Sequence, residues 1–132
     1  VTIPDWLRCV GPNNDQVIIW LGTNDALQGI YMPHFKTKLR DHLQVLEGRG
    51  CRVYLVLPPL FVQNHEAAAK IEPYRDVTLD IGLQYTNVTI IEPVWNEDLL
   101  FDGLHQEPAL HFWQAVDFIN KLGLTLPEEA EQ

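Results

Sequence analysis

The stretch VIIWLGTND, residues 17–25, decides the fold. Its first five residues are apolar and rich in β-branched side chains, which is typical of a strand buried on both faces of a parallel sheet. Gly22 ends the run, and the polar residues after it favour a tight turn. Two similar runs follow, at residues 53–57 and 88–91, and prolines end both of them. The sequence therefore predicts three buried strands.

Amphipathic segments separate and follow these strands. Residues 33–47 place apolar side chains at helical spacing, and this predicts a helix with one buried face. The segment 63–85 is helical in composition, but Pro73 is expected to break it, so we expect a helix over about residues 74–85. A last helix is expected from about residue 108 to 122. The buried face of the first helix consists of Phe35, Leu39, Leu43 and Leu46.

The alternation of strands and helices predicts an α/β fold with a parallel sheet, right-handed crossovers and helices on both faces. A chain of 132 residues suits one domain. Its net charge of −9 argues against binding to nucleic acid or to an anionic membrane surface. No apolar run approaches the length of a membrane span. Cys9 and Cys51 lack metal-ligand spacing and are interpreted as small buried residues, with a disulfide between them as the alternative.

Polar residues follow the first and third predicted strands, at the edge where ligands of parallel sheets bind. Asn24 can donate an amide N–H beside Gly22, although the same residues also suit an ordinary turn. Asp102 can accept a hydrogen bond from Nδ1 of His105 and leave Nε2 free as a general base. Alternatively, Asp102 caps the last helix and His105 is a bystander.

Together, residues 17–25 and the tetrapeptide Asp102-Gly103-Leu104-His105 resemble the third and fifth sequence blocks of the SGNH (GDSL-type) hydrolases. The resemblance implies a flavodoxin-like, three-layer α/β/α fold and a serine hydrolase acting on carboxylic esters. It makes His105 the general base and Asp102 the residue that orients it. Asn24 would be an oxyanion donor, and Gly22 would shape the oxyanion hole. The substrate class stays open between an acylated carbohydrate, a lipid and a short-chain ester.

The Gly-Asp-Ser block of that family has no counterpart here, and the chain contains no serine. The family's sheet has five strands in the order 2-1-3-4-5, and this chain supplies about three. We therefore expect residues 1–132 to form a single domain that is incomplete at its N-terminal side. A companion chain or an N-terminal fragment would carry two strands and the nucleophile. A start at Val1 favours cleavage or trimming. The alternative is a non-catalytic binding or structural module.

An apolar strand at residues 17–21 would also be unusual at a sheet edge, since natural edges are short, charged or covered. This favours an interior position.

Trp20 and Trp113 are expected in the core. Trp95 and Leu60 are candidates for the substrate-binding wall, and core packing is the alternative for Trp95. The histidines lack zinc-ligand spacing, so neither a metal nor another cofactor is expected. The sequence leaves the cellular compartment open.

Overall fold

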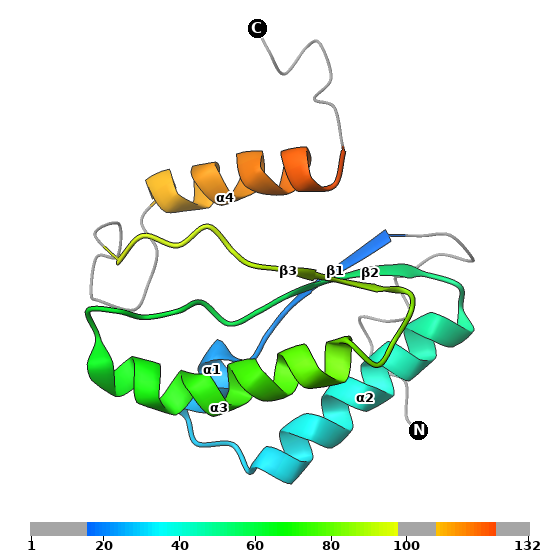
Figure 1. The fold of residues 1–132 in the computed structure, drawn as a ribbon, viewed down its shortest axis with the longest axis horizontal. Helices are drawn as coiled ribbons and strands as arrows, with labels where there is room; N and C mark the ends of the chain where they lie inside the picture. Colours follow the sequence, from blue (N-terminus) through cyan, green and yellow to red (C-terminus); the bar gives the residue numbers. More distant parts are fainter. Residues whose placement is uncertain (1–15, 98–107, 124–132) are drawn as a thin grey trace, which may run out of the picture.

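The sheet is parallel and has three strands in the order β1–β2–β3 (Figure 1). The structure is a computed structural model that describes residues 16–97 and 108–123. The strands are β1 (Gln16–Trp20), β2 (Arg52–Val56) and β3 (Val88–Ile91). Register places Ile18 beside Tyr54 and Tyr54 beside Thr89. The prediction of an α/β fold built on three parallel strands is confirmed.

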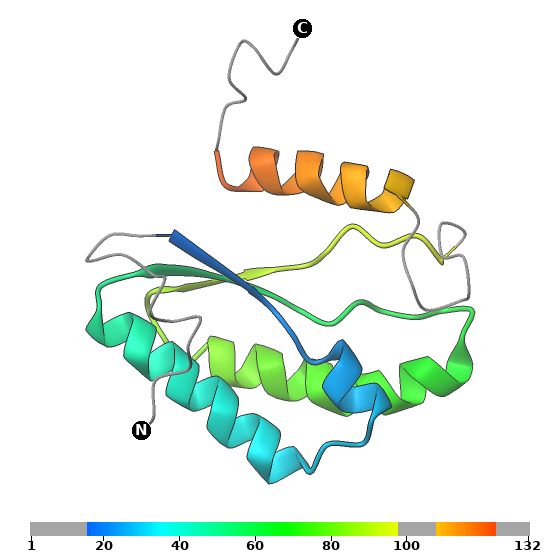
Figure 2. The same cartoon turned by 180° about the vertical axis from the view of Figure 1, so that it is seen from behind.

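Helices lie on both faces of the sheet and complete three layers. On one face lie α2 (Met32–Gly48) and α3 (His65–Gly82), and on the other lies α4 (Pro108–Lys121) (Figures 1 and 2). The short α1 (Thr23–Leu27) follows β1 and contacts α3. The tight turn expected after Gly22 therefore leads into a short helix.

The core lies between β2 and the α2–α3 layer. The four apolar residues predicted to face inward from α2 are all buried, and they meet Val53 and Leu55 of β2. Burying one such side chain contributes about 1.5–3 kcal/mol to stability. Cys51, directly before β2, is buried in the same cluster as a free thiol, as expected. Cys9 lies outside the described residues.

Helix α3 runs through Pro73 without a break, so the expected boundary at residue 74 was wrong. A proline removes the hydrogen bond to the carbonyl four residues earlier. Pro73 and Ala69 are both exposed, so water can hydrogen-bond the freed carbonyl. The helix begins eight residues before Pro73, where the Asn64 side chain accepts a hydrogen bond from the Ala67 N–H at 3.1 Å.

The prediction that β1 is buried on both faces was also wrong. β1 pairs only with β2 among the described residues and lies at the sheet's edge. Ile19 is buried, whereas Ile18 on the opposite face is 47% exposed. Ile18 is exposed because α4 packs over the carboxyl end of β1 rather than over its middle. The contact is between Phe118 and Trp20, whose ring centroids lie 5.9 Å apart.

Trp113 is 56% exposed, so its predicted core position was wrong as well. The neighbouring Gln114 is buried instead and donates from Nε2 to the Val94 carbonyl at 3.0 Å. Lys121, at the end of α4, donates to the Glu92 carbonyl at 2.8 Å. These two polar contacts fix which side of α4 faces the chain segment after β3.

Candidate functional site

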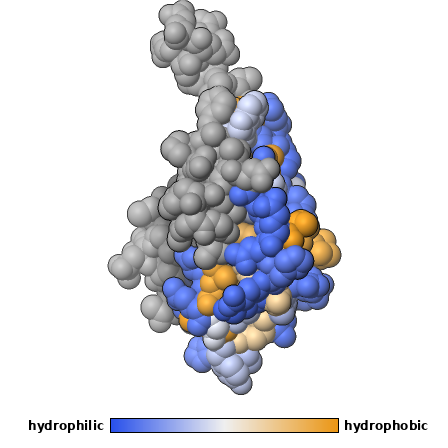
Figure 3. All heavy atoms as spheres, turned by 90° about the vertical axis from the view of Figure 1, so that its left-hand side faces the viewer, coloured by the Kyte–Doolittle hydropathy of each residue, from blue (hydrophilic) through white to orange (hydrophobic). Residues whose placement is uncertain are grey.

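The three strands end at one edge of the molecule, on the left in Figure 1. Figure 3 shows this edge from outside: apolar patches interrupt a mostly hydrophilic surface. The segments after the strands contribute large exposed apolar side chains, namely Leu21 after β1, Leu60 and Val62 after β2, and Val94 after β3. Ligands of parallel sheets bind at this edge, so its polar groups are the candidates for a functional site.

Gly22 turns the chain from β1 into α1 under tight packing. Its φ of +109° lies in the left-handed region that side chains rarely adopt. A Cβ here would lie 3.0 Å from Pro58 Cγ and 3.4 Å from Phe35 Cζ. The backbone conformation therefore favours glycine, and a side chain here would also require Pro58 to shift by a few tenths of an ångström.

Asn24 lies in α1, two residues after this turn, and its side chain is exposed. Its backbone carbonyl accepts from the Gln28 N–H at 2.9 Å, so α1 holds the residue in place through the main chain. The packing of α1 on α3 supports this position. The structure thus presents the Asn24 amide at the carboxyl edge, where the sequence placed it.

Glu97 is a feature of this edge that sequence reasoning missed. Its carboxylate accepts from three consecutive backbone N–H groups at the start of α3: Val62 at 3.0 Å, Gln63 at 2.8 and 3.0 Å, and Asn64 at 3.2 Å. Hydrogen bonds to a charged acceptor are stronger than neutral ones. Glu97 therefore links the segment after β3 to the segment after β2.

The hydrogen bonds also keep Glu97 ionised. Desolvation raises the pKa of a carboxyl group, but here the N–H groups of Gln63, Asn64 and Val62, with the charge of His65, outweigh it and lower the pKa of Glu97. Glu97 stands 33 to 35 residues from its partners, so no local pattern could reveal the contact.

Arg75 of α3 ties the same two segments together a second time. Its Nη1 donates to the Pro58 carbonyl at 2.8 Å, and its Nη2 pairs with the Glu92 carboxylate. Burial lowers the pKa of Arg75, and the nearby Asp76 opposes this effect. Free arginine titrates so high that the guanidinium stays charged. Hydrogen bonds therefore hold the chain after β2 at two places: Arg75 binds the Pro58 carbonyl, and Glu97 binds the N–H groups of residues 62–64.

Trp95 packs its ring edgewise against Phe61 with centroids 5.4 Å apart, at the margin of the core. Its indole Nε1 is buried and has no acceptor among the described residues. Leu60 is 57% exposed and lines a pocket of about 250 Å³ between its own segment and α3. Asn24 does not line that pocket, so the structure does not bring Leu60 and Asn24 together there.

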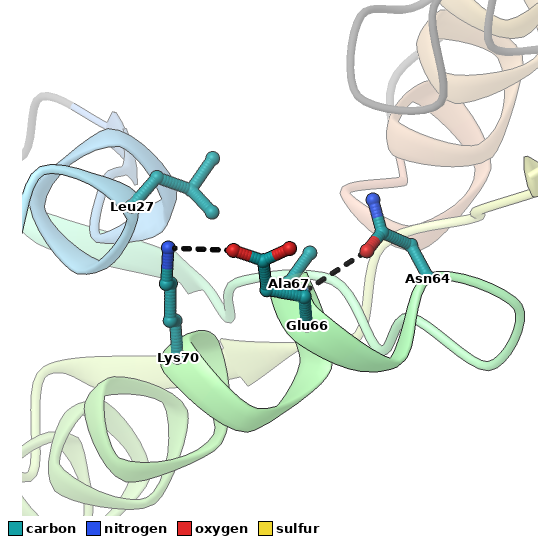
Figure 4. A pocket seen from close by; sticks show the side chains of 5 residues that line it. All are labelled: Leu27, Asn64, Glu66, Ala67 and Lys70. Atoms are coloured by element: carbon teal, nitrogen blue, oxygen red, sulfur yellow. Dashed lines mark hydrogen bonds and ion pairs between the residues drawn. The ribbon is translucent and has the colours of Figure 1, made fainter.

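Another pocket of about 250 Å³ lies between α1 and α3 (Figure 4). Lys70 and Glu66 pair along its wall at 3.2 Å, and Leu27 and Asn64 border it. A pocket of about 370 Å³ adjoins Glu97 at the start of α3. Drug-sized ligand sites measure roughly 300–1,000 Å³, so the first pocket is smaller than this range and the second lies at its lower end.

The proposed acid–base pair, Asp102 and His105, lies outside the described residues. The described segments on either side of it, the chain after β3 and the start of α4, both lie at the carboxyl edge (Figure 1). Asn24 lies in α1, toward the same edge. The two chain ends that flank residues 98–107 are therefore on the side of the sheet that carries Asn24.

Two kinds of site are not found in residues 16–97 and 108–123. No three His, Cys, Asp or Glu side chains there approach closely enough to hold a metal ion. No helix in these ranges has both the length and the apolar character needed to cross a bilayer.

Compared with models of known families and with curated proteins, the chain matches none. The resemblance to SGNH hydrolases thus rests on residues 17–25 and 102–105. The structure adds a parallel α/β fold around the first segment, with Gly22 and Asn24 at the carboxyl end of β1.

Proposed function

We propose that the chain is part of a carboxylic ester hydrolase whose serine nucleophile comes from outside residues 1–132. In this proposal His105 is the general base and Asp102 orients it. Asn24 donates to the oxyanion, and Gly22 shapes the oxyanion hole. The chain lacks serine, so the nucleophile belongs to a companion chain or an N-terminal fragment.

The turn at Gly22 is the observation that carries the proposal. A left-handed, tightly packed glycine stands directly after a parallel strand and is followed by an exposed amide side chain. Oxyanion stabilisation needs donors that are held before the charge develops. A residue fixed by the backbone of a short helix, yet open at its side chain, meets that requirement.

The proposed reaction proceeds through an acyl-enzyme. The serine oxygen attacks the ester carbonyl while His105 Nε2 takes its proton, and Asp102 stabilises the imidazolium through Nδ1–H. Asn24 donates to the developing oxyanion. His105 then gives the proton to the leaving alcohol. In the second half of the reaction, water attacks the acyl-enzyme while His105 takes its proton. His105 returns that proton to the serine oxygen as the acid leaves.

A non-catalytic module with this fold is the second candidate, and the lack of serine is the observation that favours it. A binding module, however, has no chemical need to retain Asp102, His105 and Asn24. The two proposals differ in one measurable property, which is turnover of an ester.

Hydrolysis of a short-chain aryl ester by the assembly isolated with its companion polypeptide tests the proposal. We expect His105→Ala and Asp102→Ala to abolish turnover while the assembly stays intact. His34→Ala is the matched control, because His34 is an exposed residue on α2. Equal rates in His105→Ala and His34→Ala would remove the assignment of the general base.

A further inference from the structure

Two pockets at the start of α3 share a lining residue. Asn64 lines both the pocket of about 250 Å³ between α1 and α3 and the pocket of about 370 Å³ beside Glu97, so the two pockets adjoin. They extend from Leu27 of α1 to Glu97 after β3, and we call them together the Asn64 groove; Figure 4 shows the half next to α1. The groove therefore crosses the edge at which the three strands end (Figure 1).

The backbone N–H groups at this end of α3 are already occupied. Such groups ordinarily attract anionic ligands. Here the Glu97 carboxylate accepts from the N–H groups of Val62, Gln63 and Asn64, and the Asn64 side chain accepts from the Ala67 N–H. An anion would have to displace the chain's own carboxylate before it could bind. The groove therefore disfavours phosphate and carboxylate ligands.

The carboxylates that line the groove also have partners. Each oxygen of Glu97 accepts two hydrogen bonds, which fills the lone pairs of an ionised carboxylate. Glu66 pairs with Lys70 at 3.2 Å, and the charge of His65 acts on Glu97. A cationic ligand would have to compete with these partners. The groove therefore favours a neutral ligand over a charged one.

Three neighbouring side chains supply the groove with polar groups. The Asn64 side chain uses Oδ1 to cap α3, and its Nδ2, which carries two donors, has no partner among the described residues. Gln63 and His65 are both exposed and line the pocket beside Glu97. Amides and the neutral imidazole both donate and accept hydrogen bonds, as hydroxyl groups do. A neutral ligand rich in hydroxyl groups matches this set of side chains.

We propose that the Asn64 groove binds a neutral oligosaccharide through the side chains of Gln63, Asn64 and His65. Two adjoining pockets suit an oligomer better than a single sugar ring. The proposal rests on the proposed function in one respect: it selects an acylated carbohydrate from the classes of ester that the hydrolase could cleave. Binding of the saccharide itself requires no serine.

Saturation-transfer-difference NMR on the full chain, in the assembly in which it is isolated, tests the binding. The probes are cellotetraose, xylotetraose and chitotetraose. We expect at least one of them to bind with a Kd of roughly 1 mM, since a few hydrogen bonds in an open groove contribute no more. The absence of saturation transfer to all of these tetrasaccharides would overturn the proposal.

Asn64→Ser and His65→Ala locate the binding. Serine keeps an oxygen acceptor for the cap of α3 but removes the Nδ2 donors, so the thermal midpoint should change little while the Kd rises about fivefold. His65→Ala, at an exposed position, should raise the Kd by a similar factor. The matched controls are Gln84→Ala, an exposed amide beyond the other end of α3, and His34→Ala on α2, and both should leave the Kd unchanged.

Two further results would contradict the proposal. Equal Kd values in the wild type and in both groove variants would place the saccharide elsewhere on the molecule. Displacement of the saccharide by inorganic phosphate would show that the N–H groups at the start of α3, rather than the side chains of the groove, hold the ligand.

Ester turnover, measured on the same sample, separates this proposal from the proposed function. Saccharide binding that depends on Asn64, without turnover of any ester, leaves the groove standing and removes the hydrolase. Turnover of a short-chain aryl ester without saccharide binding removes the groove and leaves the hydrolase standing. Binding together with release of acetate from the acetylated form of the same saccharide supports both.

Discussion

Gly22 lies directly against Pro58, so close that a Cβ atom on residue 22 would lie 3.0 Å from Pro58 Cγ. The contact joins the end of β1 to the segment after β2. At this contact the chain turns, with a φ of +109° at Gly22, into α1, the helix that carries Asn24.

Gly22→Ala should therefore destabilise the fold by about 2 kcal/mol, because it combines a strained φ with a contact that Pro58 cannot relieve without moving. Thermal unfolding measures the loss. Gly48→Ala is the control: this glycine ends α2, has open space around it, and should be neutral or slightly stabilising. Equal effects of the two substitutions would show that the contact with Pro58 is unimportant.

Gly82→Ala should also destabilise, by about 1–3 kcal/mol. A Cβ at the end of α3 would lie 2.6 Å from Ile90 Cδ1 and 2.8 Å from Leu55 Cδ2. Ile90→Val removes the nearer methyl group, so the double variant should lose less stability than the sum of the single changes. Strict additivity in a double-mutant cycle would contradict this picture of helix–sheet contact.

Glu97→Gln should lower stability at neutral pH by about 1 kcal/mol, because three backbone N–H groups lose a charged acceptor. Folding lowers the pKa of Glu97 below its ordinary 4.5. Its contribution is therefore complete above about pH 4.5 and disappears as the pH falls through the lowered folded-state value.

Thermal midpoints of the wild type and Glu97→Gln, measured from pH 7 down to pH 3, check this dependence. The gap between them should narrow in acid. Glu66→Gln is the control: among the described residues Glu66 forms one exposed pair, with Lys70, so its replacement should have little effect at any pH. A gap that stays constant with pH would rule out the Glu97 charge as its cause.

Asn24→Ala should lower ester turnover by the assembly about 10²–10³-fold, the usual loss for one oxyanion donor. Its side chain is exposed, so the free energy of unfolding should change by less than about 0.5 kcal/mol. Gln28→Ala, at the exposed end of the same helix, should affect neither property. Full activity in Asn24→Ala would take this residue out of the site.

Local pattern was sufficient for much of the fold. The three strands, α2 and α4 follow from apolar spacing and from the glycines and prolines that bound them. The helix break predicted at Pro73 was wrong because the energetic cost of a proline depends on whether the freed carbonyl of Ala69 can hydrogen-bond water. The spacing of apolar residues in the sequence does not reveal this. The exposure of Ile18 and Trp113 likewise depends on where α4 packs.

The candidate site was predictable only in part. Gly22 and Asn24 lie two residues apart and directly follow a recognisable strand, so their place at the carboxyl edge could be inferred. The Glu97 and Arg75 contacts join segments far apart in the chain and have no sequence signature. Asp102 and His105 remain predictions.

The proposed hydrolase requires this chain to supply the base, His105, to a serine held on another segment. Fluorophosphonate labelling of the intact assembly, compared between the wild type and His105→Ala, tests it most directly. We expect a label on one serine of the companion segment and its loss in His105→Ala. An intact assembly without a labelled serine, or one labelled equally in both proteins, would contradict it.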